Sequence, residues 1–157
     1  QLGAYTGDAS VWLSENVLTG KHSYLYDVDT WEGSDEEAHE SIDFKGVLAQ
    51  YNQVVNRFPL IRPFQMTTLK FLLTSRTLTY DFIYIDADHT AVGVLMDAEL
   101  SWPLLKPSGL LAFDDYQWGA HLPASKSPKL GIDLFLERHA GEYEILEQGL
   151  QVWIRKL

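Results

Sequence analysis

Two apolar segments that each end abruptly in acidic residues constrain the fold of this chain most strongly. Residues 81–86 form an apolar run closed by one aspartate, and residues 110–115 contain another that is followed by two aspartates. Short apolar runs of this kind are typical of buried strands. Residues 91–105 between them are long enough for a crossover helix, so we expect two neighbouring parallel strands with a right-handed connection.

The acids that follow these strands are expected to meet. In an open α/β sheet the carboxyl ends of parallel strands border the ligand-binding crevice, which would bring Asp86, Asp114 and Asp115 together. Three carboxylates at one place repel one another unless a cation or a shared proton relieves them. Mg²⁺ prefers oxygen ligands and would fit. The alternative is structural, because aspartate after a strand also caps helices and forms polar turns.

The N-terminal segment carries a glycine loop. Gly3 and Gly7 precede a segment, residues 11–18, with apolar residues at helical spacing that stops at Gly20. Glycines there let the backbone approach a ligand, although G-x-x-x-G is neither a dinucleotide fingerprint nor a P-loop and also fits a plain turn. The next expected strand, residues 23–28, ends at Asp29, where a doubly wound fold hydrogen-bonds a ribose. Together these features predict a nucleoside-containing cofactor.

With these segments the chain resembles the class I S-adenosylmethionine-dependent methyltransferases, and most of all the metal-assisted O-methyltransferases of sugars, macrolides and catechols. The matching pieces run in the family's order and cover almost the whole chain: residues 2–7, 29–33, 66–69, 81–89 and 102–116. The resemblance, like the alternation of expected strands and helices, implies an α/β fold. We expect a three-layer Rossmann-like sandwich with a mostly parallel sheet and an antiparallel C-terminal hairpin strand.

The resemblance also assigns roles to particular residues. S-adenosyl-L-methionine would contact the glycine loop through its methionine and sulfonium, Asp29 through its ribose, and two further residues through its adenine, with Asp86 also bordering it. The cofactor-binding residues are thus expected to be Gly3, Ala4, Tyr5, Gly7, Asp29, Trp31, Met66 and Asp86. For Met66, a role as ordinary core filler is equally open.

A metal ion and a base complete the expected chemistry. Mg²⁺ held by Asp86, Asp114 and Asp115 would be chelated by a vicinal diol or catechol, lowering the pKa of the reacting hydroxyl and orienting it. His89 is the expected base, because an unperturbed imidazole has a pKa of about 6.5. Asp88, one position earlier, serves in some sugar-modifying relatives, but it also fits a helix cap or a group that orients His89.

Other readings of these residues stay open. His89 also fits a surface residue without chemistry. Sugar and phenolic acceptors cannot be separated, because Trp31, Tyr116 and Trp118 would stack on either. The alternatives to the whole reading are a metal-independent methyltransferase and a non-catalytic nucleotide-binding domain of the same fold.

The chain departs from the family at its beginning. Gln1 stands where relatives carry an acid that helps to hold the cofactor, and the apolar first strand should precede this position. We therefore expect one methyltransferase domain, residues 1–157, that lacks its N-terminal first strand. Whether this piece catalyses alone is open.

Composition narrows the class of partner. A net charge of −10 disfavours nucleic acid, and the absence of cysteine excludes disulfides and thiolate zinc sites. No apolar stretch reaches the length of a membrane span and no signal peptide is visible. We expect a cytoplasmic enzyme with a small-molecule substrate, with assembly into a homo-oligomer left open. Eight acids without a Lys or Arg occupy residues 27–43, as a solvated face or as a lid over the cofactor entered through Trp31.

The remaining pattern predicts further elements: a helix over 42–56, a short strand over 60–63, a helix capped by Thr67 or Thr68, a helix from Pro128 to about 140, and a terminal hairpin of 143–146 and 150–154.

Overall fold

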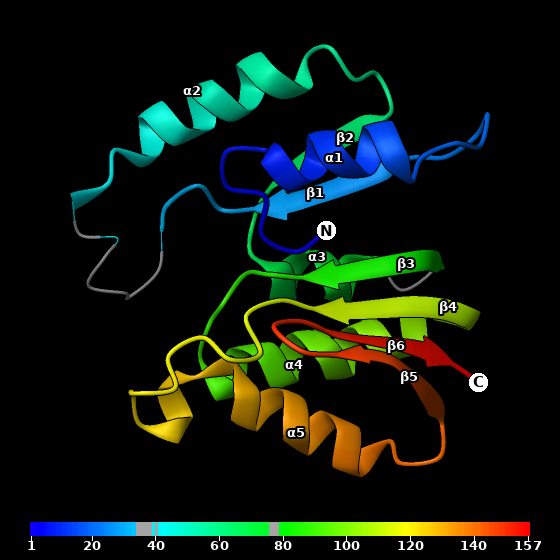
Figure 1. Ribbon diagram of the computed structural model, residues 1–157. Helices are drawn as coiled ribbons and strands as arrows, with labels where there is room; N and C mark the ends of the chain where they lie inside the picture. The colour runs from blue at the N-terminus through cyan, green and yellow to red at the C-terminus, as the bar shows by residue number, and fades with distance from the viewer. Residues whose placement is uncertain (34–38, 40, 76–78) are drawn as a thin grey trace. The chain divides into compact units, whose positions relative to one another are not determined.

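The computed structural model describes residues 1–33, 39, 41–75 and 79–157, and within these it is an α/β protein (Figure 1). Its elements fall into two compact units, Gln1–Thr67 and Thr68–Leu157, each considered by itself below. The first unit contains α1 (Asp8–Asn16), β1 (Leu25–Asp29), α2 (Phe44–Val55) and β2 (Ile61–Gln65). The second contains α3 (Thr68–Thr74), β3 (Tyr80–Ile85), α4 (Ala91–Ser101), η2 (Trp102–Leu104), β4 (Leu105–Phe113), η3 (Ala124–Lys126), α5 (Pro128–Arg138), β5 (Tyr143–Gln148) and β6 (Val152–Lys156).

The first unit is built on the parallel pair β1 and β2, with Asp29 opposite Gln65 at their carboxyl ends. The chain before α1 joins β1 as well, because Leu2 forms a parallel bridge with Val28. The helix α2 presents Val47, Tyr51 and Val55 to the interior, which are the buried positions of an amphipathic helix. The expected helix over 42–56 is thus confirmed, and the short strand expected over 60–63 is shifted by one or two residues.

The second unit contains a four-stranded sheet in the order β3-β4-β6-β5. The strands β3 and β4 are parallel, whereas β6 pairs antiparallel with both β4 and β5. Ile85 lies opposite Phe113, so the carboxyl ends of β3 and β4 lie side by side. The segment between them forms α4, which confirms the predicted β-α-β unit. The antiparallel pairing of β5 with β6 confirms the predicted terminal hairpin.

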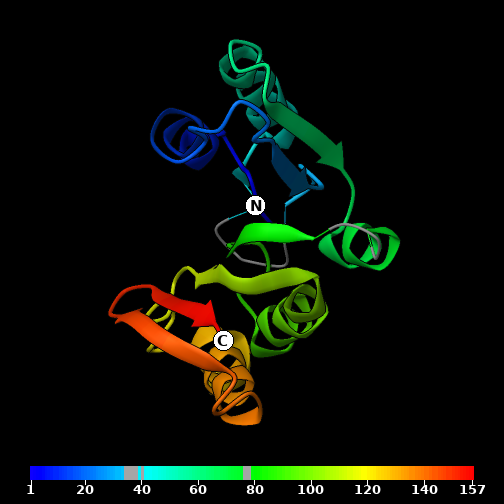
Figure 2. The same ribbon diagram turned by 90° about the vertical axis from the view of Figure 1, so that its right-hand side faces the viewer.

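A dense apolar core holds the helices of this unit on its sheet. Helices α4 and α5 pack together against one face of the sheet (Figure 2). Phe135 of α5 lies 5.5 Å from Phe113 of β4, between ring centroids, and 5.5 Å from Trp102. Burying one such aromatic side chain contributes about 1.5–3 kcal/mol. Gly131 permits the close helix contact, since a Cβ there would lie 3.2 Å from the Cα of Ala91 and closer still to its carbonyl oxygen.

Several boundaries differ from the expectation: α1 ends at Asn16, well before Gly20, and β1 covers Leu25–Asp29 where a strand was expected over 23–28. The segment 91–105 contains the expected crossover helix, but α4 ends at Ser101, and β4 already begins at Leu105 although the strand was expected only from residue 110. A 3₁₀ turn containing Pro103 separates them, because proline cannot continue the helical hydrogen-bond pattern. The hairpin turn was expected at 147–149, whereas β5 continues to Gln148 through an irregularity after Ile145. No helix among the described residues is long and apolar enough to cross a membrane.

Candidate active site

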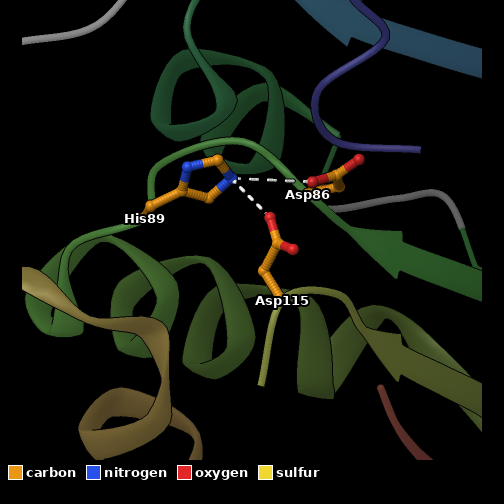
Figure 3. Close-up of side chains that lie close together, drawn as sticks. All are labelled: Asp86, His89 and Asp115. Carbon is orange, nitrogen blue, oxygen red and sulfur yellow. Dashed lines mark ion pairs between the residues drawn. The ribbon is translucent and has the colours of Figure 1, made fainter. Parts of the chain in front are cut away.

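An imidazole and two carboxylates converge at the carboxyl ends of β3 and β4. Nε2 of His89 lies 3.1 Å from Oδ2 of Asp115 and 3.7 Å from Oδ1 of Asp86 (Figure 3). One potential ligand atom from each of the three residues lies within 4.8 Å of the others. Asp86 follows β3, Asp115 follows β4, and His89 lies in the loop that leads into α4. The predicted convergence of strand-end acids is therefore observed for Asp86 and Asp115, with His89 between them.

The backbone after β4 determines which of the two adjacent aspartates faces His89. Asp115 has a φ of 55°, a left-handed conformation that aspartate tolerates better than most residues. Its amide donates to Oδ1 of Asp114 at 2.8 Å, which stabilises the turn. The turn sends the carboxylate of Asp115 toward the imidazole (Figure 3).

Asp114 is anchored by neighbouring strands. Tyr84 Oη donates to Oδ2 of Asp114, and Gln151 Nε2 donates to its Oδ1 at 3.0 Å. Gln151 is itself oriented by Trp153, whose Nε1 donates to Oε1 of Gln151 at 2.9 Å. A carboxylate oxygen has two lone pairs, so Asp114 can accept these bonds and still face a cation. Its predicted role as a ligand stays a prediction.

Burial and like charge affect the ionisation of this site. Burial raises the pKa of Asp86, and the charges of Asp114 and Asp115 raise it further, against the opposing contact with His89. Burial and the hydrogen bond to Asp114 also raise the pKa of the Tyr84 phenol. A raised pKa for Asp86 beside two further carboxylates indicates a site that favours an added proton or cation.

The loop before α4 is organised by two short hydrogen bonds. Oδ1 of Asp88 accepts from the amide of Thr90 at 2.7 Å, and Oγ1 of Thr90 accepts from the amide of Gly93 at 3.1 Å. Thr90, not Asp88, is therefore the N-cap of α4. Asp88 instead fixes the turn that carries His89. The ring of His89 also lies 4.8 Å from that of Trp118, between centroids.

An open hollow of about 790 Å³ lies beside these groups. Its walls come from the loop after β4, with Asp114, Asp115, Gln117 and Trp118, and from the β5–β6 turn, with Glu147, Leu150 and Gln151. The volume is within the range of small-molecule sites, about 300–1,000 Å³. Of the aromatic residues expected to stack on an acceptor, Trp118 lines the hollow. Tyr116 is instead 9% exposed, and its hydroxyl donates to Asp133 at 2.8 Å.

The glycine loop of the first unit is held by Asp29. Oδ2 of Asp29 accepts from the amides of Ala4 at 2.8 Å and Tyr5 at 2.9 Å, and its Oδ1 accepts from the amide of Trp31 at 2.8 Å. Gly7 has a φ of 88°, and a Cβ there would lie 3.1 Å from the ring of Tyr51. The predicted loop residues and the predicted ribose-binding acid are thus brought together. Gly3, also in this loop, has a positive φ.

The two residues expected near adenine lie at the same end of β1 and β2. Trp31 is only 5% exposed; its ring centroid is 4.6 Å from that of Tyr51, and its Nε1 donates to the carbonyl of Tyr5 at 2.9 Å. Met66 is half-buried, and its amide donates to the carbonyl of Asp29 at 2.9 Å. Trp31 therefore packs beneath the glycine loop as part of the core, and its ring has little exposed surface on which a ligand could stack.

Several site residues were not found from the sequence. Tyr84 comes from β3, Glu147 from β5 and Gln151 from the β5–β6 turn, and no local spacing connects Tyr84 with the other two. In the first unit, Asp27 was grouped with the acidic stretch, yet it is fully buried and accepts from Tyr51 Oη at 2.8 Å. Burial raises its pKa. The predicted lid falls largely on residues 34–38 and 40, which lie outside the described residues.

Comparisons with known proteins agree with this arrangement. A family model described as a methyltransferase domain matches residues 1–116. The structure resembles that of an O-methyltransferase from Bacillus cereus in complex with SAH, with a TM-score of 0.69 and 16% identity over 99% of this chain and 72% of that one. It also resembles the O-methyltransferase TomG from Streptomyces achromogenes, involved in tomaymycin synthesis and in complex with SAM, with a TM-score of 0.72 and 16% identity over 99% and 70% of the two chains.

A third similar structure is that of the O-methyltransferase NovP, with a TM-score of 0.71 and 14% identity over 99% of this chain and 69% of that one. No protein of curated function matches the sequence significantly. The chain belongs to the family of methyltransferase domains, and its fold is the Rossmann-like α/β fold of these O-methyltransferases. The resemblance to class I S-adenosylmethionine-dependent O-methyltransferases drawn from the sequence is confirmed.

Proposed function

We propose that this protein is an S-adenosylmethionine-dependent O-methyltransferase that acts on a hydroxyl of a small molecule, a sugar or another vicinal diol or catechol, with the help of a divalent metal ion. One observation carries the proposal beyond the family: His89, Asp86 and Asp115 converge at the carboxyl ends of β3 and β4, beside a hollow of about 790 Å³. The O-methyltransferases of similar structure, two of them with SAM or SAH, support the choice of cofactor and reaction.

The cofactor would use the glycine loop of the first unit. S-adenosyl-L-methionine supplies an electrophilic methyl group when bound. Gly3, Ala4, Tyr5 and Gly7 would line its methionine and sulfonium, and Asp29 would meet its ribose. Asp29 already accepts from the amides of Ala4 and Tyr5, so the acid and the glycine loop lie together where a ribose would bind. Met66 suits the adenine better than the buried Trp31 does. The expected role of Asp86 in cofactor binding stays a prediction.

The donor set fits a divalent metal ion. Asp86 and Asp115 offer carboxylate oxygens, and Asp114 adds a third carboxylate one residue away. Carboxylates suit Mg²⁺, whereas an additional imidazole ligand from His89 would favour Mn²⁺ or another transition metal. Such an ion would lower the pKa of the acceptor hydroxyl and orient it. The shared negative charge of the three acids is the reason to expect it.

His89 is the group best placed to accept the proton of the acceptor hydroxyl. Its Nε2 points into the space between Asp86 and Asp115. Its side chain is 19% exposed, but both ring nitrogens are buried, so the imidazole is oriented by its surroundings. Asp88 holds the turn on which His89 lies, through its bond to Thr90. The second possible role of His89 is as a metal ligand, favoured by the short distances among the three ligand atoms.

Turnover with labelled cofactor, Mg²⁺ and a panel of sugars and catechols tests the proposal. His89→Ala should lower kcat by about 10²-fold while cofactor affinity is preserved, because a positioned base acts on the chemical step. Chelation of divalent ions with EDTA should abolish activity of the wild type. If Asp88→Asn shows the larger loss, the base is Asp88. If activity survives EDTA, the enzyme is metal-independent.

Cofactor binding separates an enzyme from a non-catalytic domain of the same fold. Isothermal titration with S-adenosylhomocysteine should give saturable binding, and no binding at millimolar concentration would refute the methyltransferase reading. We further propose a small-molecule substrate, no nucleic acid or membrane partner, a cytoplasmic location and possible assembly into a homo-oligomer, since the net charge is −10 and no described helix could span a membrane.

A further inference from the structure

The hollow beside the candidate active site is acidic. Three of the residues that line it are Asp114, Asp115 and Glu147, and no Lys, Arg or His is among the described residues of its walls. The other lining residues are uncharged: Gln117, Trp118, Leu150 and Gln151. A pocket of this composition attracts positive charge and repels anions.

Glu147 reaches the hollow because of a bulge in β5. Ile145 pairs with Ile154 and Glu147 pairs with the next residue of β6, Trp153, so Leu146 is an extra residue in β5. Such bulges turn a strand and redirect its side chains. Among the described residues Glu147 has no cationic partner within ion-pair distance, whereas Glu144 of the same strand pairs with Arg155 at 3.0 Å.

Hydrogen bonds join the β5–β6 turn, next to Glu147, to the loop that follows β4. The amide of Tyr116 donates to the carbonyl of Leu150 at 2.9 Å, and Gln117 Nε2 donates to the carbonyl of Gly149 at 3.0 Å. Gln148 Nε2 donates to Tyr116 Oη at 3.1 Å. These bonds hold the β5–β6 turn beside the loop after β4, so the backbone that carries Glu147 has a defined place beside the hollow.

A bound metal ion would not remove this acidity. A divalent cation held by Asp86 and Asp115 balances those two charges, which leaves Asp114 and Glu147. Asp114 is engaged by Tyr84 and Gln151, whereas Glu147 is exposed and lines the hollow. Glu147 is therefore the charge that an acceptor meets at the side of the hollow formed by the β5–β6 turn.

We propose that Glu147 is a specificity-determining residue, and that the acceptor carries an ammonium group in addition to its adjacent hydroxyls. The inference rests on the function proposed above and adds the charge of the substrate to it. Amine-bearing catechols and amino sugars share this chemistry. Glu147 would pair with the ammonium group while the hydroxyls lie near His89 and Asp115.

Matched acceptors test the proposal. 4-(Aminomethyl)catechol, 4-(hydroxymethyl)catechol and 3,4-dihydroxybenzoate differ chiefly in the charge of one substituent. The assay uses the intact protein with Mg²⁺ and saturating cofactor at low salt. An exposed charge should raise kcat/KM a few-fold for the cation and lower it a few-fold for the anion, both relative to the neutral acceptor. The value of kcat/KM should therefore be about tenfold higher for the cation than for the anion. The preference should shrink with added salt. An amino sugar tested beside its neutral parent sugar decides between the two acceptor types.

Glu147→Gln should reduce the preference to about twofold. The matched control is Glu144→Gln, which removes a charge from the same strand outside the hollow and should leave the preference intact. Equal kcat/KM for cation and anion, or an undiminished preference in Glu147→Gln, would overturn the proposal.

Acceptor binding gives a readout that does not depend on methyl transfer. Saturation-transfer NMR with the same three compounds and Mg²⁺ should rank them cation, neutral, anion, and Glu147→Gln should compress the ranking. Ranked binding without turnover would contradict the proposed reaction and support the charge selectivity. Turnover without charge ranking would support the reaction and refute the role of Glu147, and no binding of any of the compounds would also refute it.

Discussion

The substitution Gly93→Ala tests whether the turn held by Asp88 positions His89. A Cβ at Gly93 would lie 2.6 Å from the Cβ of Asp88 and closer still to its carboxyl group. Carbon atoms in contact are normally about 3.5–4 Å apart, so the turn must move by about 1 Å. This movement breaks the 2.7 Å bond from the amide of Thr90 to Asp88 and displaces the neighbouring His89.

The expected stability change is small, while the expected loss of activity is large. Overpacking costs about 1–3 kcal/mol, and the higher helix propensity of alanine offsets about 1 kcal/mol of this, for a net destabilisation of about 1 kcal/mol. A misplacement of about 1 Å at a catalytic group can reduce turnover by about 10²-fold. Urea unfolding gives the first quantity, and kcat on any accepted substrate gives the second.

Gly46→Ala is the matched control, because Gly46 is the third residue of α2 as Gly93 is of α4. The nearest atoms to a Cβ there all belong to the side chain of Asp43, with Oδ2 at 2.9 Å and Cγ at 3.3 Å. That carboxylate makes no capping bond and can rotate away. This variant should be stabilised by about 0.5–1 kcal/mol with unchanged kcat. If Gly93→Ala matches Gly46→Ala in both stability and kcat, Asp88 does not position His89.

The sequence predicts the elements around the site because they are local. The apolar run before Asp86, the helical spacing of Val47, Tyr51 and Val55, and Pro128 at the start of α5 each depend on a few neighbouring residues. The parallel pairing of β3 and β4 follows from the length of the segment between them. The convergence of Asp86 and Asp115 is a consequence of that pairing, so it too was predictable.

What the sequence could not give is the direction of each side chain at the strand ends. Consecutive residues of an extended chain point to opposite sides, so Asp114 and Asp115 do not present their carboxylates in the same direction. The left-handed conformation of Asp115 and the bonds from Tyr84 and Gln151 to Asp114 decide the matter. The position of Glu147 at the hollow depends on a bulge in β5, which no local sequence pattern predicts.

Two further predictions concern residues outside the hollow. Asp29→Ala removes the acceptor of the amides of Ala4, Tyr5 and Trp31; it should destabilise the protein by about 1–3 kcal/mol in urea unfolding and abolish binding of S-adenosylhomocysteine, whereas exposed Glu32→Gln should do neither. The second is a pH dependence that arises at His139, whose ring nitrogens lie 2.9 Å from Glu142 and 3.2 Å from Glu99. Burial would lower the pKa of His139, but these two contacts outweigh burial and raise it. A raised pKa in the folded protein means that the contribution to stability is complete below the ordinary value of 6.5 and is lost as the pH rises through the folded value. Wild type should therefore lose more stability than His139→Gln between pH 6 and 8, with exposed His121→Gln behaving like wild type; parallel curves for wild type and His139→Gln would show that the charged imidazole contributes nothing.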